Sequence, residues 1–252
     1  MDFRALTTNA YSKLHELIAL NSEPPLVPFL GFEYSEGQAD ITYGWQERDF
    51  TRELINTFNK YALWVWRLDL WEEVFRSYAE DEVLELRLEF ATLPLNYCLS
   101  APYKFKSRIV FCATQLCYTK GLSNKLISTK SVREDDKINI NTLIEVAKHW
   151  VSGPELVKAL RDVDAQKYRE ATGDYRNKSQ HRHPPGLDFG LIASVERSFP
   201  AGCFVSYSFG ELPPLTTSNV LSALVAEADL MKTAFLAYRA LIEEHSGVNN
   251  ET

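Results

Sequence analysis

Residues 47–78, ERDFTRELINTFNKYALWVWRLDLWEEVFRSY, give the clearest indication of the fold class. They contain no glycine or proline, the residues that most often interrupt a helix. Large apolar side chains recur in this stretch at steps of three and four residues, the period of one face of an α-helix. They are Phe50, Leu54, Phe58, Tyr61, Val65, Leu68, Trp71, Phe75 and Tyr78. The pattern predicts one long helix with an apolar stripe that must pack against other helices.

Further helices are predicted on both sides of this one. Residues 3–20 carry about one apolar side chain per helical turn, and residues 82–93 and 103–120 continue in the same style. Breaks are expected at Pro94 and Pro102, because proline removes a helical hydrogen bond and clashes with the preceding turn. A second long helix, kinked or split, should therefore return antiparallel to the first, as in a helical bundle.

The C-terminal half predicts more helices and one hairpin. A helix should end at Gly153, and the next should run from Glu155 and stop by His183, since Pro184 and Pro185 cannot continue it. Alternating apolar residues around a Pro-Ala-Gly turn predict a β-hairpin at 188–210, and a final apolar stripe predicts a helix at 217–246, capped by Thr217 or Ser218. Residues 22–45, with three prolines and three glycines, should form an irregular loop.

Together these patterns predict a single, mainly α domain over residues 1–252. Its expected architecture is an antiparallel helical bundle with an added β-hairpin and a C-terminal helix.

Charge is unevenly spread along the chain. With 27 Lys and Arg against 34 Asp and Glu, the net charge is −7, which argues against a non-specific nucleic-acid binder. Residues 100–133, however, contain seven basic residues and no acid, which makes them a candidate phosphate-binding surface. Residues 72–89 contain seven acids and two arginines, and we expect that stretch to face solvent or a partner.

The sequence predicts a cytoplasmic protein without membrane segments, metal or cofactor. The start of the chain lacks the basic and apolar regions of a secretory signal, and the longest charge-free stretch, residues 212–226, is too short and polar to span a bilayer. None of the four cysteines forms a C-x-x-C pair, so we expect reduced thiols inside the core.

The densest polar cluster is residues 174–183, DYRNKSQHRH. In it Arg176 precedes His181 by five positions. Arginine holds a phosphate with a planar fork of donors, and histidine transfers protons near neutral pH, so the pair has what metal-independent RNA cleavage needs.

Two alternatives explain the same cluster. Basic residues also suit the negative end of a helix dipole, so a solvated helix end accounts for them without any function. A metal site of His181, His183, Asp174 and Asp188 is disfavoured, because two histidines two positions apart on a helix point to different sides.

The hexapeptide Arg176-Asn177-Lys178-Ser179-Gln180-His181 resembles the signature of the HEPN superfamily, R-x(4–6)-H, commonly with Asn directly after the Arg. The resemblance covers residues 47–183 loosely and the motif closely. It implies a HEPN-like bundle and a homodimer in which the motifs of two subunits form a composite endoribonuclease site.

The resemblance also implies roles for these residues. His181 would transfer a proton at the attacking 2′-hydroxyl or the leaving 5′-oxygen, Arg176 would hold the scissile phosphate, and Asn177 would orient the site by hydrogen bonding. Further contacts to RNA are expected from Lys178 within the motif, from Arg182 directly after it, and from the basic run at Lys104, Lys106 and Arg108.

The expected function is a metal-independent endoribonuclease of toxin or defence type, with RNA as substrate and an antitoxin or regulatory protein as a possible partner. The alternative is a non-catalytic HEPN-like module that binds RNA, a nucleotide or a protein. A purely structural helical protein with an accidental motif is the third interpretation.

Overall fold

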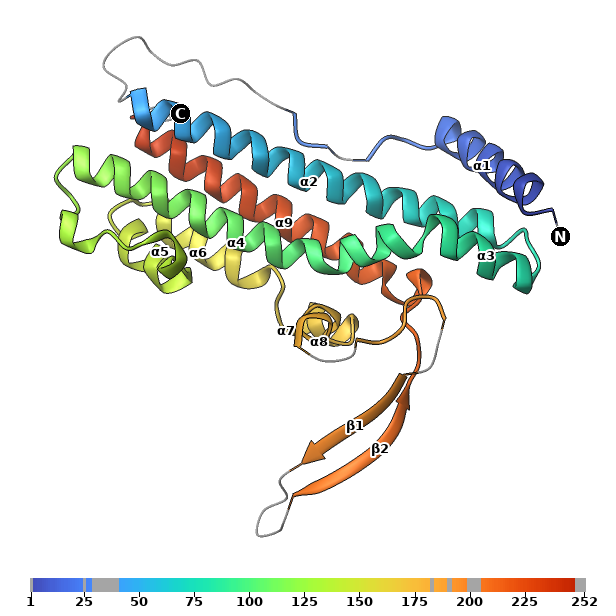
Figure 1. Cartoon of the computed structure of the whole chain (residues 1–252). Helices are drawn as coiled ribbons and strands as arrows, with labels where there is room; N and C mark the ends of the chain where they lie inside the picture. The colour runs from blue at the N-terminus through green and yellow to red at the C-terminus, as the bar shows by residue number, and fades with distance from the viewer. Residues whose placement is uncertain are drawn as a thin grey trace. The chain divides into compact units, whose positions relative to one another are not determined.

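The computed structural model describes residues 2–24, 26–28, 41–181, 184–189, 192–198 and 205–247, and this part of the chain is mainly helical (Figure 1). The prediction of a mainly α fold is thereby confirmed. No helix within the described ranges is long and apolar enough to cross a membrane. The elements are α1 (Phe3–Leu20), α2 (Ile41–Phe75), α3 (Glu80–Phe90), α4 (Thr92–Ser123), α5 (Ile140–Ala147), α6 (Gly153–Asp162), α7 (Gln166–Ala171), α8 (Tyr175–His181), β1 (Ile192–Ser198), β2 (Ser206–Leu212) and α9 (Thr217–His245), with short 3-10 turns at Thr129–Ser131 and Asp135–Lys137.

The chain forms two compact units. The first unit comprises Met1–Pro24, Leu63–Ser100 and Gln166–Val225, and the second comprises Pro25–Ala62, Ala101–Ala165 and Ala226–Thr252. Helices α2, α4 and α9 each contribute a segment to both units. A single domain over the whole chain stays a prediction.

Each unit has an aromatic core. In the first unit the Trp71 ring stacks on Phe75 and Phe90, with centroids 5.5 and 4.5 Å apart. In the second unit the ring centroids of Phe58 on α2 and Phe105 on α4 are 6.4 Å apart. Phe235 and Tyr238 of α9 are fully buried. These residues belong to the apolar stripes of the sequence, so burial of those stripes holds the helices together.

The predicted helices at the two ends of the chain and the long helix between them are confirmed. Asp2 caps α1 by accepting hydrogen bonds from the backbone N–H groups of Arg4 and Ala5. Helix α2 begins at Ile41, earlier than predicted, so the irregular segment expected over 22–45 is shorter; residues 25 and 29–40 lie outside the described part. The cap of α9 is Thr216, whose Oγ1 accepts from the Asn219 backbone, and not Thr217 or Ser218.

The second long helix is split, as expected, but at Ala91 between α3 and α4; the breaks expected at Pro94 and Pro102 were wrong, because α4 runs through both prolines. Pro94 lies in the first turn, where the backbone N–H has no helical partner in any case. Pro102 lies inside the helix and leaves the carbonyl of Cys98 without its usual donor four residues on. The Tyr168 hydroxyl donates to that carbonyl at 3.3 Å, which replaces the missing bond.

The single helix expected from Glu155 to His183 was also wrong, because this stretch forms α6, α7 and α8. The first break falls at Asp164, whose φ of 53° is left-handed, and the second at Gly173 and Asp174, with φ of 60° and 54°. Left-handed residues commonly end helices. At the first break Lys106 Nζ donates to the Val163 carbonyl at 2.8 Å and Glu227 accepts from the Asp164 backbone N–H at 2.6 Å, so side chains bind the backbone there.

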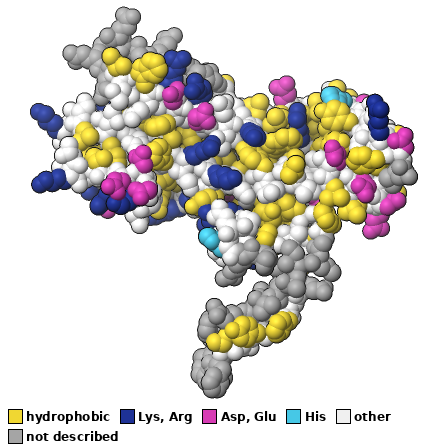
Figure 2. Space-filling model, in the orientation of Figure 1, with side chains coloured by type: hydrophobic (Ala, Val, Ile, Leu, Met, Phe, Trp, Pro, Cys, Tyr) yellow, Lys and Arg dark blue, Asp and Glu magenta, His cyan; other side chains and the backbone are white. Residues whose placement is uncertain are grey.

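The predicted hairpin is confirmed. Strands β1 and β2 pair antiparallel from Ile192 with Leu212 to Ser198 with Ser206, while its turn lies outside the described residues. Its base is closed by bonds from the Leu215 N–H to the Gly186 carbonyl and from the Asp188 N–H to the Leu215 carbonyl, both 2.8 Å. Among the described side chains of the hairpin, Val205, Tyr207 and Phe209 are exposed hydrophobic residues, and a hydrophobic patch is visible there (Figure 2); Phe209 is 81% exposed.

The cysteines that the structure describes are Cys98, Cys112 and Cys117, and all three are buried free thiols, as predicted. Burial raises their pKa values, that of Cys112 to about 12. Cys203 lies outside the described residues.

A buried histidine joins three helices of the second unit. His245, at the end of α9, is 2% exposed, and its Nδ1 lies 2.8 Å from the hydroxyl of Tyr43 near the start of α2. Its Nε2 lies 3.9 Å from the sulfur of Cys117 near the end of α4. The start of α2 therefore meets the ends of α4 and α9, so α2 runs antiparallel to both helices. For α2 and α4 this orientation was predicted from the sequence. Burial, with the nearby charge of Lys120, lowers the pKa of His245 to about 3.

We expect His245 to make the fold sensitive to acid. The unfolded chain protonates this residue below pH 6.5, whereas the folded chain does not until about pH 3, so the free energy of unfolding should fall as pH drops between these values. At about 1.4 kcal/mol per pH unit, roughly 3 kcal/mol should be lost by about pH 4.5. Urea unfolding across this pH range should show a shallower acid slope for His245→Gln than for the parent. The exposed His149→Gln should keep the parental slope, and an unchanged slope in His245→Gln would contradict the assignment.

Candidate functional site

The motif residues lie on α8, a short helix of the first unit. The left-handed turn at Gly173 and Asp174 sets its start, and the buried side chains of Thr172 and Tyr175 fix it to the unit. A Cβ on Gly173 would lie 3.6 Å from Pro185, so this turn packs against the segment that follows α8. The chain is thus held on both sides of the motif.

Three residues at the start of α8 form a hydrogen-bonded relay. The Nη1 atom of Arg176 donates to Oδ1 of Asn177 at 2.6 Å, and Nδ2 of Asn177 donates to Oδ1 of Asp174 at 2.7 Å. The amide of Asn177 uses its oxygen toward the arginine and its nitrogen toward the aspartate. This Asp174–Asn177–Arg176 relay orients the guanidinium relative to the helix.

His181 is the last residue of α8, and its side chain is exposed. Five residues of an α-helix correspond to a rotation of roughly 140° about its axis, so Arg176 and His181 lie on different sides of α8. Lys178 is half-buried on the same helix, and Arg182 lies outside the described residues.

The metal alternative loses one of its ligands. The carboxylate of Asp188 is bound to Arg87 and fully buried, and His183 is outside the described residues. Among the residues that the structure describes, no group of three His, Cys, Asp or Glu side chains lies close enough together to hold a metal ion.

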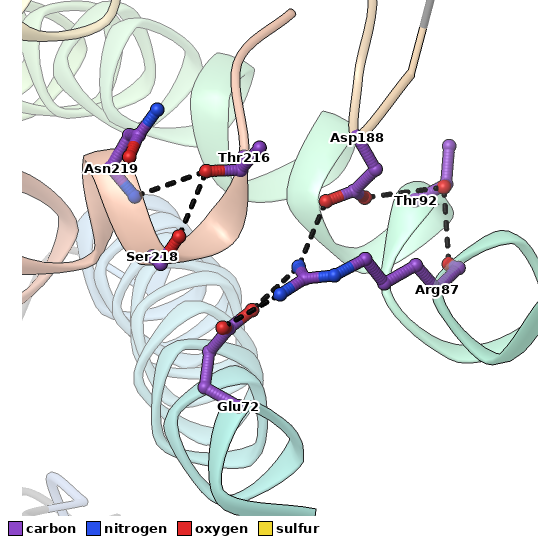
Figure 3. A network of polar contacts seen from close by, with 7 residues as sticks. All are labelled: Glu72, Arg87, Thr92, Asp188, Thr216, Ser218 and Asn219. Carbon is purple, nitrogen blue, oxygen red and sulfur yellow. Dashed lines mark hydrogen bonds and ion pairs between the residues drawn. The ribbon is translucent and has the colours of Figure 1, made fainter. Parts of the chain in front are cut away.

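The carboxylates of Glu72 and Asp188 share the guanidinium of Arg87 (Figure 3). The two terminal nitrogens of Arg87 donate to the two oxygens of Glu72 at 2.6 and 2.8 Å, and Nη1 also donates to Asp188 at 3.0 Å. Thr92 Oγ1 lies 3.4 Å from the other oxygen of Asp188. We call these residues the Arg87 network; it joins α2, α3 and the start of α4 to the segment that follows α8.

The charges of the Arg87 network depend on one another. Burial alone would lower the pKa of Arg87, but hydrogen bonds and charge attraction from Glu72 and Asp188 raise it above its usual value. Burial raises the pKa of Asp188 even though Arg87 attracts its negative charge. Buried carboxylates of this kind require a cationic partner.

The sequence did not reveal the Arg87 network. Residues 72–89 were expected to face solvent or a partner, yet Glu72 is buried against Arg87. One signal was available, since Glu72 lies four residues after Leu68 and three before Phe75, on the apolar stripe of α2. A carboxylate on a buried stripe indicates a buried partner of opposite charge.

The basic run proposed for RNA lies on α4 in the second unit. Lys106 donates to the Val163 carbonyl, and Nη1 of Arg108 donates to the Thr57 hydroxyl at 2.7 Å. Lys104 is exposed. Two of the three side chains therefore stabilise the unit itself, which gives a structural reason for part of this charge.

Comparisons of the chain with protein-family models, with curated proteins and with solved structures find no match. The residues themselves define a helical protein with an arginine braced by a relay and an exposed histidine on one short helix. A guanidinium can bind a phosphate through paired donors, and an exposed imidazole can exchange protons near neutral pH.

We expect Arg87→Gln to destabilise the protein by about 3 kcal/mol or more, because it leaves two buried carboxylates without a cation. The matched control is Arg52→Gln, which breaks an exposed ion pair with Asp49 and should cost no more than about 1 kcal/mol. Urea unfolding measures both changes. Equal costs for the two variants would contradict a structural role for the Arg87 network.

Proposed function

We propose that this protein is a metal-independent endoribonuclease of HEPN-like type, in which Arg176 and His181 carry the reaction. The observation that supports this best is the Asp174–Asn177–Arg176 relay, since it braces the guanidinium through the asparagine of the motif. A solvated helix end needs no such brace. The exposure of His181 also supports a chemical role, because a core histidine would be inaccessible to substrate.

The reaction uses a nucleophile within the RNA. The 2′-oxygen attacks the adjacent phosphorus and loses its proton, while the bond to the 5′-oxygen breaks and that oxygen gains a proton. The products carry a 2′,3′-cyclic phosphate and a 5′-hydroxyl. His181 serves as a base when neutral and as an acid when protonated, and Arg176 stabilises the charge on the non-bridging oxygens. Since the nucleophile is internal, the proposal requires no metal or cofactor.

A homodimer is part of the proposal. Arg176 and His181 lie roughly 140° apart around α8, a separation that favours a phosphate bound between two copies over one bound by a single helix. Two copies also supply two histidines, one for each proton transfer. A two-fold axis near α8 would place both motifs at one phosphate.

Additional contacts to RNA are assigned to the basic side chains. Lys178 lies within the motif and Arg182 directly after it, and Lys104 of α4 is exposed. Lys106 and Arg108 are expected to contribute less to RNA binding, because their charged groups already donate hydrogen bonds to the Val163 carbonyl and the Thr57 hydroxyl. An enzyme that cuts RNA requires restraint, so an antitoxin or regulatory protein fits a toxin or defence role.

We expect His181→Ala to abolish cleavage of RNA and to leave the fold intact. Truncation of an exposed side chain usually changes stability by no more than about 0.5 kcal/mol, whereas loss of acid–base assistance slows a reaction by about 10²–10⁴-fold. The measurements are a thermal melt and the cleavage rate of a fluorescent RNA in the presence of EDTA. The matched control is Gln180→Ala, an exposed neighbour on the same helix that should retain the parental rate.

Three outcomes would contradict the proposal. A low melting temperature of His181→Ala would mean that the residue is structural. Equal cleavage by parent and variant would place the activity elsewhere. Binding of RNA without cleavage by the parent would favour the non-catalytic module.

A further inference from the structure

A second candidate site lies between α5 and α6 in the second unit, away from the motif in the sequence. The two helices lie side by side (Figure 1) and border a cavity of about 380 Å³. Gly153 permits their close approach, since a Cβ there would lie 2.0 Å from the Ala147 carbonyl oxygen. Cavities of 300–1,000 Å³ are typical of sites for small molecules.

The cavity wall is apolar on both helices. The apolar residues on it follow helical spacing on α5 and on the first turns of α6, and they are Ile144, Ala147, Pro154 and Val157. Ala147 and Val157 are buried, whereas Ile144 is half-buried and Pro154 is exposed. Such a wall favours a ligand with a flat or compact apolar body.

The rim of the cavity is positively charged. Lys148, Lys158 and Arg161 line it, together with a single acid, Asp162, so the lining carries a net charge of +2. All three basic side chains are exposed, and within the described part of the chain no ion pair or hydrogen bond engages their charged groups. Lys158 and Arg161 are three residues apart and so lie on one side of α6.

We propose that this α5–α6 cavity binds a small phosphate monoester with an apolar body, the chemistry of a nucleoside monophosphate. A phosphate monoester carries about −1.5 to −2 charge at pH 7, which matches the net +2 of the lining better than a single carboxylate does. Arg161 supplies a planar fork for two phosphate oxygens, and the lysines add point charges. The flat face of the base lies against the apolar wall. This site is independent of the proposed cleavage of RNA.

Binding is tested by calorimetric titration of the full chain with adenosine 5′-monophosphate. We expect a Kd below 1 mM. This corresponds to a binding free energy on the order of −4 kcal/mol, which is modest for a ligand of this size. Adenosine, which lacks the phosphate, and inorganic phosphate, which lacks the apolar body, should each bind at least about tenfold more weakly. These two probes separate the contributions of the wall and the rim.

Variants locate the bound ligand. Arg161→Gln should weaken binding of the monophosphate at least about tenfold. Lys158→Gln should also weaken this binding. Two controls should stay within about twofold of the parent: Lys130→Gln, an exposed lysine outside the cavity, and His181→Ala on α8. Thermal melts of all four variants confirm that they fold.

Four results would overturn the proposal. They are no binding of the monophosphate at millimolar concentration, an unchanged Kd in Arg161→Gln, inorganic phosphate binding as tightly as the monophosphate, and loss of binding in His181→Ala. The last result would move the ligand to the motif. Failure of RNA cleavage, in contrast, has no bearing on this site.

Discussion

The shared charge of Arg87 is the interaction on which the placement of the motif depends. Two buried carboxylates, one on α2 and one directly after the chain returns from α8, bind the same guanidinium. Burial of either ionised carboxylate would be strongly unfavourable without the cation. Because Asp188 is fixed in this way, the segment containing Pro185 packs on the turn at Gly173, and α8 is held at both of its ends. The Asp174–Asn177–Arg176 relay begins at the same left-handed turn.

Local sequence patterns predicted the regular elements and missed the places where distant residues intervene. Helix α2 and the hairpin were predicted because their side chains follow periods of 3.6 and 2 residues. The break expected at Pro102 was wrong, since Tyr168, far along the chain, supplies the hydrogen bond that the proline removes. The split between α6 and α7 was missed for the same reason, because Lys106 and Glu227 bind the backbone at that point.

For the candidate site, the resemblance of the motif implied that Asn177 orients the site by hydrogen bonding, and in the structure Asn177 bonds to Arg176 and Asp174. The partners of Glu72 in the Arg87 network could not be predicted, because Glu72, Arg87 and Asp188 are brought together only by the tertiary fold. The cavity between α5 and α6 is not predictable from local sequence patterns either. Its basic residues are spread between positions 148 and 161, and only the pairing of two helices places them on one rim.

The chemical nature of the RNA ends distinguishes the proposed metal-independent cleavage from hydrolysis by a metal-bound water. RNA of defined sequence is incubated with the purified protein in EDTA, and the ends of the fragments are mapped by mass spectrometry. The proposed mechanism predicts fragments with a 2′,3′-cyclic phosphate and a 5′-hydroxyl, because in it the 2′-oxygen of the RNA is the nucleophile. Fragments with a 5′-phosphate and a 3′-hydroxyl, or cleavage that requires a divalent ion, would contradict it.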